Sequence, residues 1–316
     1  MEQGKIVIAG VLWGFVGVFA LSLKGAGLTT GEVAELRFIF SALALGVFLF
    51  FYDKKLLKPK NIFSSFMLGT FNFITTLCYY KCIGYSGASV ACVLLYSSPV
   101  VVVCVVAAIN KKPPSKITVL AIIATLLGLM LAGNVFSARA SKRGFIFGVV
   151  SALSNAAVTL VGARGIKKSN PLTLNFYGFL FSAILGIMFL RTESLAIALK
   201  PYNLLTVLAL AVLCTVIPYT LYVSALKGCS AEKASLLCSS EPIVASVLDC
   251  VIYSRSPTFG LIMGLGSIVI AVWLVGIKNS SITKVKEHKK IKTEKVKKEG
   301  KYVDKQILQG SSDRAW

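Results

Sequence analysis

Residues 88–109 read ASVACVLLYSSPVVVVCVVAAI, a run with no charged side chain and a single proline, Pro99, near its middle. A helix needs about 20 apolar residues to cross the hydrocarbon core of a bilayer. In lipid every backbone polar group must be satisfied within the protein, and a helix satisfies them within one segment. This stretch therefore predicts a membrane-spanning helix.

Comparable stretches recur along the whole chain of 316 residues. Hydrophobic residues make up 56% of it, charged residues 15%, and the mean hydropathy is +0.77, whereas soluble domains carry about 25% charged residues. We therefore expect an all-α polytopic membrane protein with ten transmembrane helices and no separate soluble domain. The other nine predicted spans are 5–23, 33–52, 61–81, 116–134, 144–163, 172–191, 203–226, 233–254 and 258–277. The first resembles a signal peptide in length, but its leading segment is weakly charged, and we expect it to be retained.

The positive charge is spread in a way that predicts topology. Of the 34 Lys and Arg residues, 12 follow Ile277. With the N-terminus inside, the inner loops and ends hold 25 basic residues and the outer loops hold 8. Cytoplasmic loops are enriched in Lys and Arg, so we expect a multi-pass protein of the cytoplasmic membrane with both termini in the cytoplasm. Nucleic acid is not an expected partner, because no basic face interleaved with aromatic residues appears.

The chain repeats itself at a distance of 143 residues. At this shift Ala88, Leu94 and Pro99 fall on Ala231, Leu237 and Pro242. We expect a first five-helix repeat over 1–137, a second over 138–277, and a basic, disordered cytoplasmic tail over 278–316. Because five is odd, the second repeat enters the membrane from the opposite side, an arrangement typical of secondary transporters.

These motifs resemble the EamA-like transporters of the drug/metabolite transporter superfamily. The resemblance covers 5–277 and is carried by Leu12-Trp13-Gly14, Leu36-Arg37-Phe38, Ser-Ser-Pro-Val at 97–100 and Ser-Ser-Glu-Pro-Ile-Val-Ala at 239–245. The sequence departs from the family where a Gly-Glu pair usually precedes the fifth helix of each repeat. Asn110-Lys111 and Ser254-Arg255 stand there instead.

The resemblance implies a secondary transporter, more an exporter than an importer, for amino acids or related amphipathic metabolites. Its expected partners are the small-molecule substrate and membrane lipids, with a homodimer left open, and no cofactor is expected. Alternatives are a transporter of nucleotide- or sugar-type metabolites or of drugs, a non-transporting scaffold or sensor, and a channel. An enzyme is not expected, because the one histidine is His288 in the tail and no catalytic cluster appears.

Charged residues within membrane spans are costly and mark functional sites. Glu241 is the first candidate, for substrate binding or proton coupling; alternatively, it caps backbone groups freed by Pro242 or pairs with Arg37. Asp249 is a second candidate for proton coupling. Arg37 is a candidate ligand for a substrate carboxylate, although arginine also reaches to lipid headgroups readily.

A small-molecule pocket combines aromatic walls with a few polar groups, and the resemblance places the cavity on helices one, three, four, six, eight and nine. Pro99 and Pro242 are candidate hinges. The eight cysteines lie in or beside apolar runs without zinc-site spacing, so we expect packing roles and no metal. The candidate substrate-binding residues, besides Glu241 and Arg37, are Trp13, Asn72, Tyr79, Tyr80, Ser98 (the repeat mate of Glu241), Asn155, Tyr219 and Tyr222.

Overall fold

A computed structural model describes residues 2–133, 141–252 and 256–276, which are helical without any strand. The tail 278–316, the boundary between 137 and 138, and Ser254-Arg255 lie outside the described residues. The α-helices are α1 (Glu2–Gly14), α2 (Val16–Gly25), α3 (Thr30–Tyr52), α4 (Ile62–Leu95), α5 (Ser98–Asn110), α6 (Lys116–Ala132), α7 (Lys142–Gly165), α8 (Pro171–Gly186), α9 (Thr192–Ala198), α10 (Pro201–Ala211), α11 (Ile217–Ala225), α12 (Ala231–Leu237), α13 (Ser240–Ile252) and a last helix, Phe259–Gly276.

Eight helical stretches in the described ranges are long and apolar enough to cross a membrane. One of them, Ile62–Asn110, covers two predicted spans, and Gly87 between them has a left-handed φ of 82°. The predicted span 116–134 corresponds to α6, an apolar helix of 17 residues that falls short of the others. The chain is thus a multi-pass helical membrane protein, and the count of ten spans stays a prediction.

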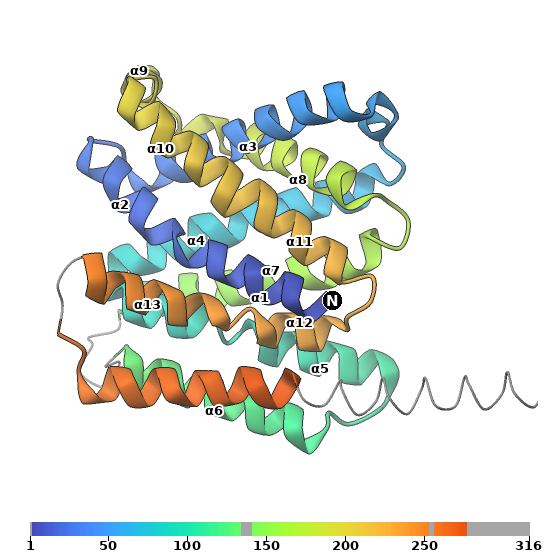
Figure 1. Cartoon of the computed structure of the whole chain (residues 1–316), viewed down its shortest axis with the longest axis vertical. Coiled ribbons are helices and arrows are strands. Elements are labelled where there is room, and N and C mark those ends of the chain that lie inside the picture. Colours follow the sequence, from blue (N-terminus) through green and yellow to red (C-terminus); the bar gives the residue numbers. More distant parts are fainter. Residues whose placement is uncertain (1, 134–140, 253–255, 277–316) are drawn as a thin grey trace, which may run out of the picture.

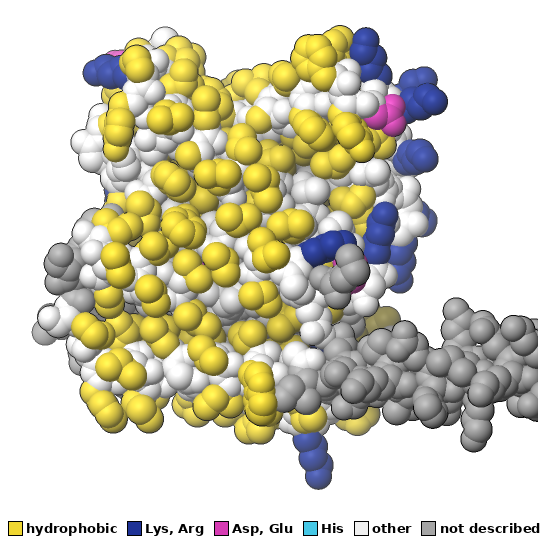
Figure 2. All heavy atoms as spheres, in the orientation of Figure 1, with side chains coloured by type: hydrophobic (Ala, Val, Ile, Leu, Met, Phe, Trp, Pro, Cys, Tyr) yellow, Lys and Arg dark blue, Asp and Glu magenta, His cyan; other side chains and the backbone are white. Residues whose placement is uncertain are grey.

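The surface agrees with a lipid environment. Phe51, Val251 and Phe259 are at least 71% exposed, which water would oppose and lipid permits. Figure 2 shows hydrophobic side chains over most of the visible face, with Lys and Arg gathered toward the edge where the N-terminus lies. The two edges of this apolar face correspond to the two ends of the helix bundle.

Several predicted spans are single in the sequence but broken in the structure. The span 5–23 breaks at Phe15, between α1 and α2, and the span 233–254 breaks at Cys238 and Ser239, between α12 and α13. The span 203–226 contains a π-helical turn, Val212–Val216. Turn-like backbone hydrogen bonds bridge the first two breaks, for example from Phe15 N to Leu12 O and from Ser239 N to Leu236 O.

The span predicted at 172–191 also ends early. After α8 come a 3₁₀ turn, Ile187–Phe189, and the unpredicted helix α9. The Arg191 guanidinium donates from Nε to Oε1 of Glu32 at 2.6 Å, and Ser194 in the first turn of α9 donates to the same oxygen. These bonds fix the α8–α9 connection on the start of α3, and only tertiary contacts supply them.

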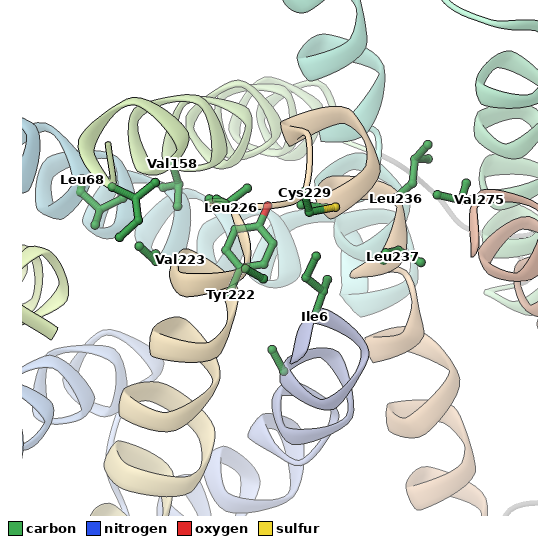
Figure 3. Close-up of a cluster of buried hydrophobic side chains, with 14 of the residues drawn as sticks. Ile6, Leu68, Val158, Tyr222, Val223, Leu226, Cys229, Leu236, Leu237 and Val275 are labelled. Atoms are coloured by element: carbon green, nitrogen blue, oxygen red, sulfur yellow. The ribbon is translucent and has the colours of Figure 1, made fainter. Parts of the chain in front are cut away.

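One end of the bundle is packed by a large buried cluster (Figure 3). It joins Ile6 near the start of the chain, Ile166 after α7, Leu226 after α11, Leu237 of α12 and Val275 of the last helix. We call this the N-terminal end. The far end holds the end of α2, the start of α3 and α9 (Figure 1). Because α1 begins and α7 ends at the same cluster, the first helices of the two sequence repeats run in opposite directions.

Candidate functional site

Three helix breaks surround one cavity inside the bundle. Trp13 and Val16 flank the break at Phe15; Tyr96 and Ser98 flank a second break at Tyr96–Ser97, between α4 and α5. The third break, at Cys238–Ser239, is the repeat mate of the second, and Cys238 and Glu241 beside it also line the cavity. Such interrupted helices are how transporters place polar groups near the bilayer midplane.

Both sequence repeats contribute to the cavity wall. The lining atoms leave about 920 Å³ of empty space between them, a volume that includes space continuous with solvent. The lining residues are Trp13, Val16, Arg37, Thr75, Thr76, Tyr79, Tyr80, Leu95, Tyr96, Ser98, Asn155, Val158, Thr159, Tyr219, Tyr222, Ser235, Cys238 and Glu241.

Most candidate residues named from the sequence meet in this cavity. These are Trp13, Arg37, Tyr79, Tyr80, Ser98, Asn155, Tyr219, Tyr222 and Glu241. Asn72 is the exception: it is buried in α4 and does not line the cavity. Asp249 lies two turns beyond Glu241 on α13 and does not line the cavity, so its proton-coupling role stays a prediction.

Arg37 is held inside the bundle rather than at the headgroups. Its side chain is buried, donates from Nε to Oγ1 of Thr215 at 2.6 Å, and donates from Nη2 to the carbonyl of Cys214 at 3.1 Å. Pro218 lacks the N–H that would bond to this carbonyl in a regular helix. The proline and the π turn therefore present an acceptor that orients the guanidinium. The guanidinium also hydrogen-bonds with Tyr80 of the cavity wall, and it carries five N–H groups in all.

Glu241 is the second residue of α13 and lies close to α1, because Gly10 has no side chain there. It interacts electrostatically with Arg37, yet the salt bridges of the described residues include neither side chain. The cavity thus presents a cation and an acid that interact without a direct salt bridge, and a structural pairing of Arg37 with Glu241 stays a prediction.

Aromatic rings form one wall of the cavity. Trp13 packs edge-on against Tyr219 with ring centroids 5.0 Å apart and against Tyr222 at 5.6 Å. The Tyr222 hydroxyl is 2.8 Å from Oγ1 of Thr159. Such rings offer apolar contact area with polar edges, which suits a ligand that is partly apolar.

Some buried polar atoms in the cavity have no protein partner. They are Nε1 of Trp13 and Oγ1 of Thr75. Leaving buried donors unpaired is costly, and such atoms are where a polar ligand or water binds. Asn155, by contrast, donates from Nδ2 to Oγ of Ser98 at 2.9 Å, which joins α7 to the start of α5.

Pro99 and Pro242 stand in the first turn of a helix, as the second residue of α5 and the third of α13. A proline there costs no helix hydrogen bond, because those N–H groups are unpaired anyway. Each proline therefore follows a break rather than kinking a continuous helix. Their role as hinges stays a prediction.

Some residues of the site were not singled out from the sequence. Thr75 and Thr76 lie three or four residues before Tyr79 and so share its helix face, a signal that was available. Ser235 lines the cavity only because α12 packs where it does. The described residues contain no group of three or more His, Cys, Asp or Glu that could hold a metal ion.

Comparison with known proteins places these features in a family context. The model of the EamA-like transporter family matches residues 4–134 and 142–277. An uncharacterized transporter of Archaeoglobus fulgidus is 29% identical over 86% of this chain and 95% of its own length. The uncharacterized inner membrane transporter YicL of Salmonella typhimurium is 25% identical over 84% of this chain and 93% of its own length. A solved crystal structure, 15% identical, has the same fold, with a TM-score of 0.72 over 89% of this chain and 98% of its own.

Proposed function

Because the chain belongs to the EamA-like transporter family, we propose that it is a secondary transporter that moves small amphipathic metabolites, such as amino acids, by alternating access. The two repeats would rock around the cavity that they share. The same family membership supports a transporter over an enzyme.

The observation that carries the substrate class is the charge arrangement in the cavity. Arg37 offers guanidinium N–H groups for a carboxylate, and Glu241 offers an acceptor for an ammonium group. Trp13, Tyr219 and Tyr222 offer an aromatic wall for the substrate's side chain. An α-amino acid carries these three chemical features in one small molecule.

Glu241 is also the proposed coupling group. A carboxyl in a cavity that alternately opens to each side could exchange a proton for substrate, and Asp249 remains a second candidate for this role. Export is the proposed direction, with both termini in the cytoplasm. The Lys and Arg side chains gathered toward the N-terminal end (Figure 2) support this orientation, since cytoplasmic loops are enriched in them.

The proposal is tested by counterflow in proteoliposomes loaded with pooled amino acids, nucleosides, polyamines or nucleotide sugars. We expect saturable exchange of amino acids, and loss of that exchange in Glu241→Gln. Glu193→Gln is the matched control, because that carboxylate is 82% exposed on α9, and its exchange should equal the wild type.

The other outcomes separate the alternatives. Exchange of nucleotide sugars or nucleosides alone would replace the amino-acid substrate class. Flux without saturation or counterflow would indicate a channel. If the folded protein exchanges none of the pools, the result favours a non-transporting scaffold or sensor. Full proton-coupled exchange by Glu241→Gln would show that Glu241 is not the coupling group.

A further inference from the structure

Another carboxyl, buried and without a partner, lies inside a membrane span and outside the cavity. Glu35 belongs to α3, is 1% exposed, and neither of its carboxyl oxygens has a hydrogen-bond partner. Glu35 falls within the predicted span 33–52 but is not among the candidate residues named from the sequence. A buried, unpaired acid in a membrane span marks a functional site more often than a structural one.

The surroundings of Glu35 are apolar. Its carboxyl sits against Gly186, the last residue of α8, so closely that a side chain at Gly186 would overlap Oε2. The ring of Phe73 on α4 lies at the same place and packs on Phe189 with centroids 5.9 Å apart. Gly186 thus provides a cradle for the carboxyl that any other residue would fill.

Among the residues that the structure describes, no salt bridge includes this carboxyl. α8 and the turn after it carry no charged residue from Pro171 to Phe189, and α4 carries none from Ile62 to Tyr80. The first cation further along α4 is Lys81, whose Nζ lies over the ring of Phe147, 5.1 Å from its centroid. On α3 itself, Arg37 is committed to the π turn on the cavity side.

Glu32 lies one turn before Glu35 on α3, and its carboxylate, unlike that of Glu35, has several hydrogen-bond partners. Its carboxylate accepts from Arg191 at 2.6 Å, from Ser194 at 2.5 Å and from the backbone N–H of Thr29 at 2.7 Å. In return the carboxylate raises the pKa of Arg191 above its already high ordinary value, so the pair stays charged. Arg191 is thereby engaged and does not neutralise Glu35.

The charge on Glu35 is therefore unfavourable in this conformation for two independent reasons. An isolated carboxylate out of water loses its hydration without compensation. In addition, Gly186 is at the C-terminus of α8, where the helix dipole repels negative charge. The neutral acid, with a proton on one oxygen, is the form that this site accommodates.

We propose that Glu35 is a proton-binding site of the transporter, separate from the substrate cavity. It holds a proton while α3, α4 and the end of α8 are packed as here. It releases the proton to water when these helices separate in the opposite access state, leaving a hydrated carboxylate. The role of this proton in transport rests on the proposed function. The presence of the proton on Glu35 rests only on the burial of the carboxyl and on its contacts.

The proton itself is tested by infrared spectroscopy of the purified, lipid-reconstituted full chain at neutral pH. We expect a C=O stretching band of a neutral carboxyl that shifts in D₂O, is absent in Glu35→Gln and persists in Glu241→Gln. Absence of a band that depends on Glu35 would overturn the proposal, whether or not any substrate is found.

The purpose is tested by transport. Counterflow involves no net proton movement, so Glu35→Gln should exchange amino acid within about twofold of wild type, a spread expected for a site that does not touch substrate. Accumulation driven by a pH gradient should be lost. If the buried amide of glutamine prevents folding, Glu35→Met replaces Glu35→Gln, because methionine is apolar and of similar length. The same results are expected: counterflow near that of the wild type and no pH-driven accumulation.

Two transport outcomes would overturn the proposal. One is pH-driven accumulation by Glu35→Gln equal to wild type. The other is loss of counterflow together with accumulation in both folded variants, which would make Glu35 a packing residue. If the wild type shows no counterflow, the proposed function fails, and the infrared band still decides whether Glu35 holds a proton.

Discussion

The two ends of the helix bundle are packed in different ways. At the N-terminal end one buried cluster joins helices of both repeats, including Ile6, Leu226 and Leu237 (Figure 3). At the far end a separate buried group joins α2, α3, α9 and α10. Another group joins the region of Tyr96, beside the cavity, to α6 and the last helix. No buried cluster among the described residues joins these two groups.

The glycines of the first predicted span show the same contrast. In α1, a Cβ at Gly10 would overlap Oγ of Ser240, and one at Gly14 would come within 2.7 Å of Val244. In α2, Gly17 and Gly25 have no such neighbour within 4 Å. The span is thus packed tightly against α13 before the break at Phe15, and after it α2 packs on α3, α9 and α10 instead. We expect the close packing of α1 on α13 to hold the N-terminal end closed in this conformation.

The largest expected effect lies between the two ends, in the cavity. Arg37→Gln removes the one buried cation that lines it, and losing a desolvated charge contact costs about 2–5 kcal/mol. We expect amino-acid exchange to fall about 100-fold, measured as initial counterflow rates over a range of substrate concentrations.

Thr215→Val is the matched control for Arg37→Gln. It removes the hydroxyl that accepts from Nε and keeps the guanidinium, so a few-fold loss is expected from a hydrogen bond worth about 1 kcal/mol. Unchanged kinetics in Arg37→Gln would remove Arg37 from the site. Equal losses in both variants would assign it to positioning the π turn alone.

The packing of the N-terminal end can be weakened by a substitution in its buried cluster. Leu237 is 2% exposed in the N-terminal cluster, and Leu→Ala in a core costs about 2–5 kcal/mol. If the cluster exists only in the closed conformation, Leu237→Ala should raise the population open at that end about tenfold or more. Cys229, buried in the same cluster, reports this as its rate of labelling by a membrane-impermeant thiol reagent.

Labelling of the Cys229 thiol is expected to be faster when the N-terminal end is open. Burial raises the pKa of the Cys229 thiol, so little thiolate is present at neutral pH while the end is closed. Opening lowers this pKa toward its ordinary value and adds access, and both changes speed labelling. Leu205→Ala, at a residue 68% exposed, should leave the rate unchanged. Equal labelling in Leu237→Ala and wild type would show that the cluster is not a gate.

The smallest expected effect compares the two parts of the first span. Gly10→Ala must displace Ser240 and should lower the free energy of unfolding by about 1–3 kcal/mol. Gly17→Ala meets no neighbour and should raise it by up to about 1 kcal/mol, since alanine favours helix. Thermal unfolding of the two purified variants in detergent measures the difference. Equal melting temperatures would contradict the close packing of α1 on α13.

Much of the fold could be predicted from the sequence. Lipid leaves few structures to an apolar chain, so hydropathy alone placed helices at the predicted spans. The repeat that sets Pro99 on Pro242 predicted equivalent positions, and the structure has equivalent breaks just before them. The sequence also identified most of the cavity-lining candidates, because polar and aromatic residues are few in such spans and stand out.

What the tertiary structure alone decided is the environment of each side chain. Glu35 and Arg37 are two residues apart on α3 and therefore point to nearly opposite sides of a helix with 3.6 residues per turn. The sequence does not say that one side meets a proline-freed carbonyl of the π turn and the other meets Gly186 and Phe73. Nor does it place Asn72 outside the cavity or Ser235 inside it. Helix periodicity fixes the direction of a side chain, whereas its neighbours depend on contacts between segments more than 100 residues apart.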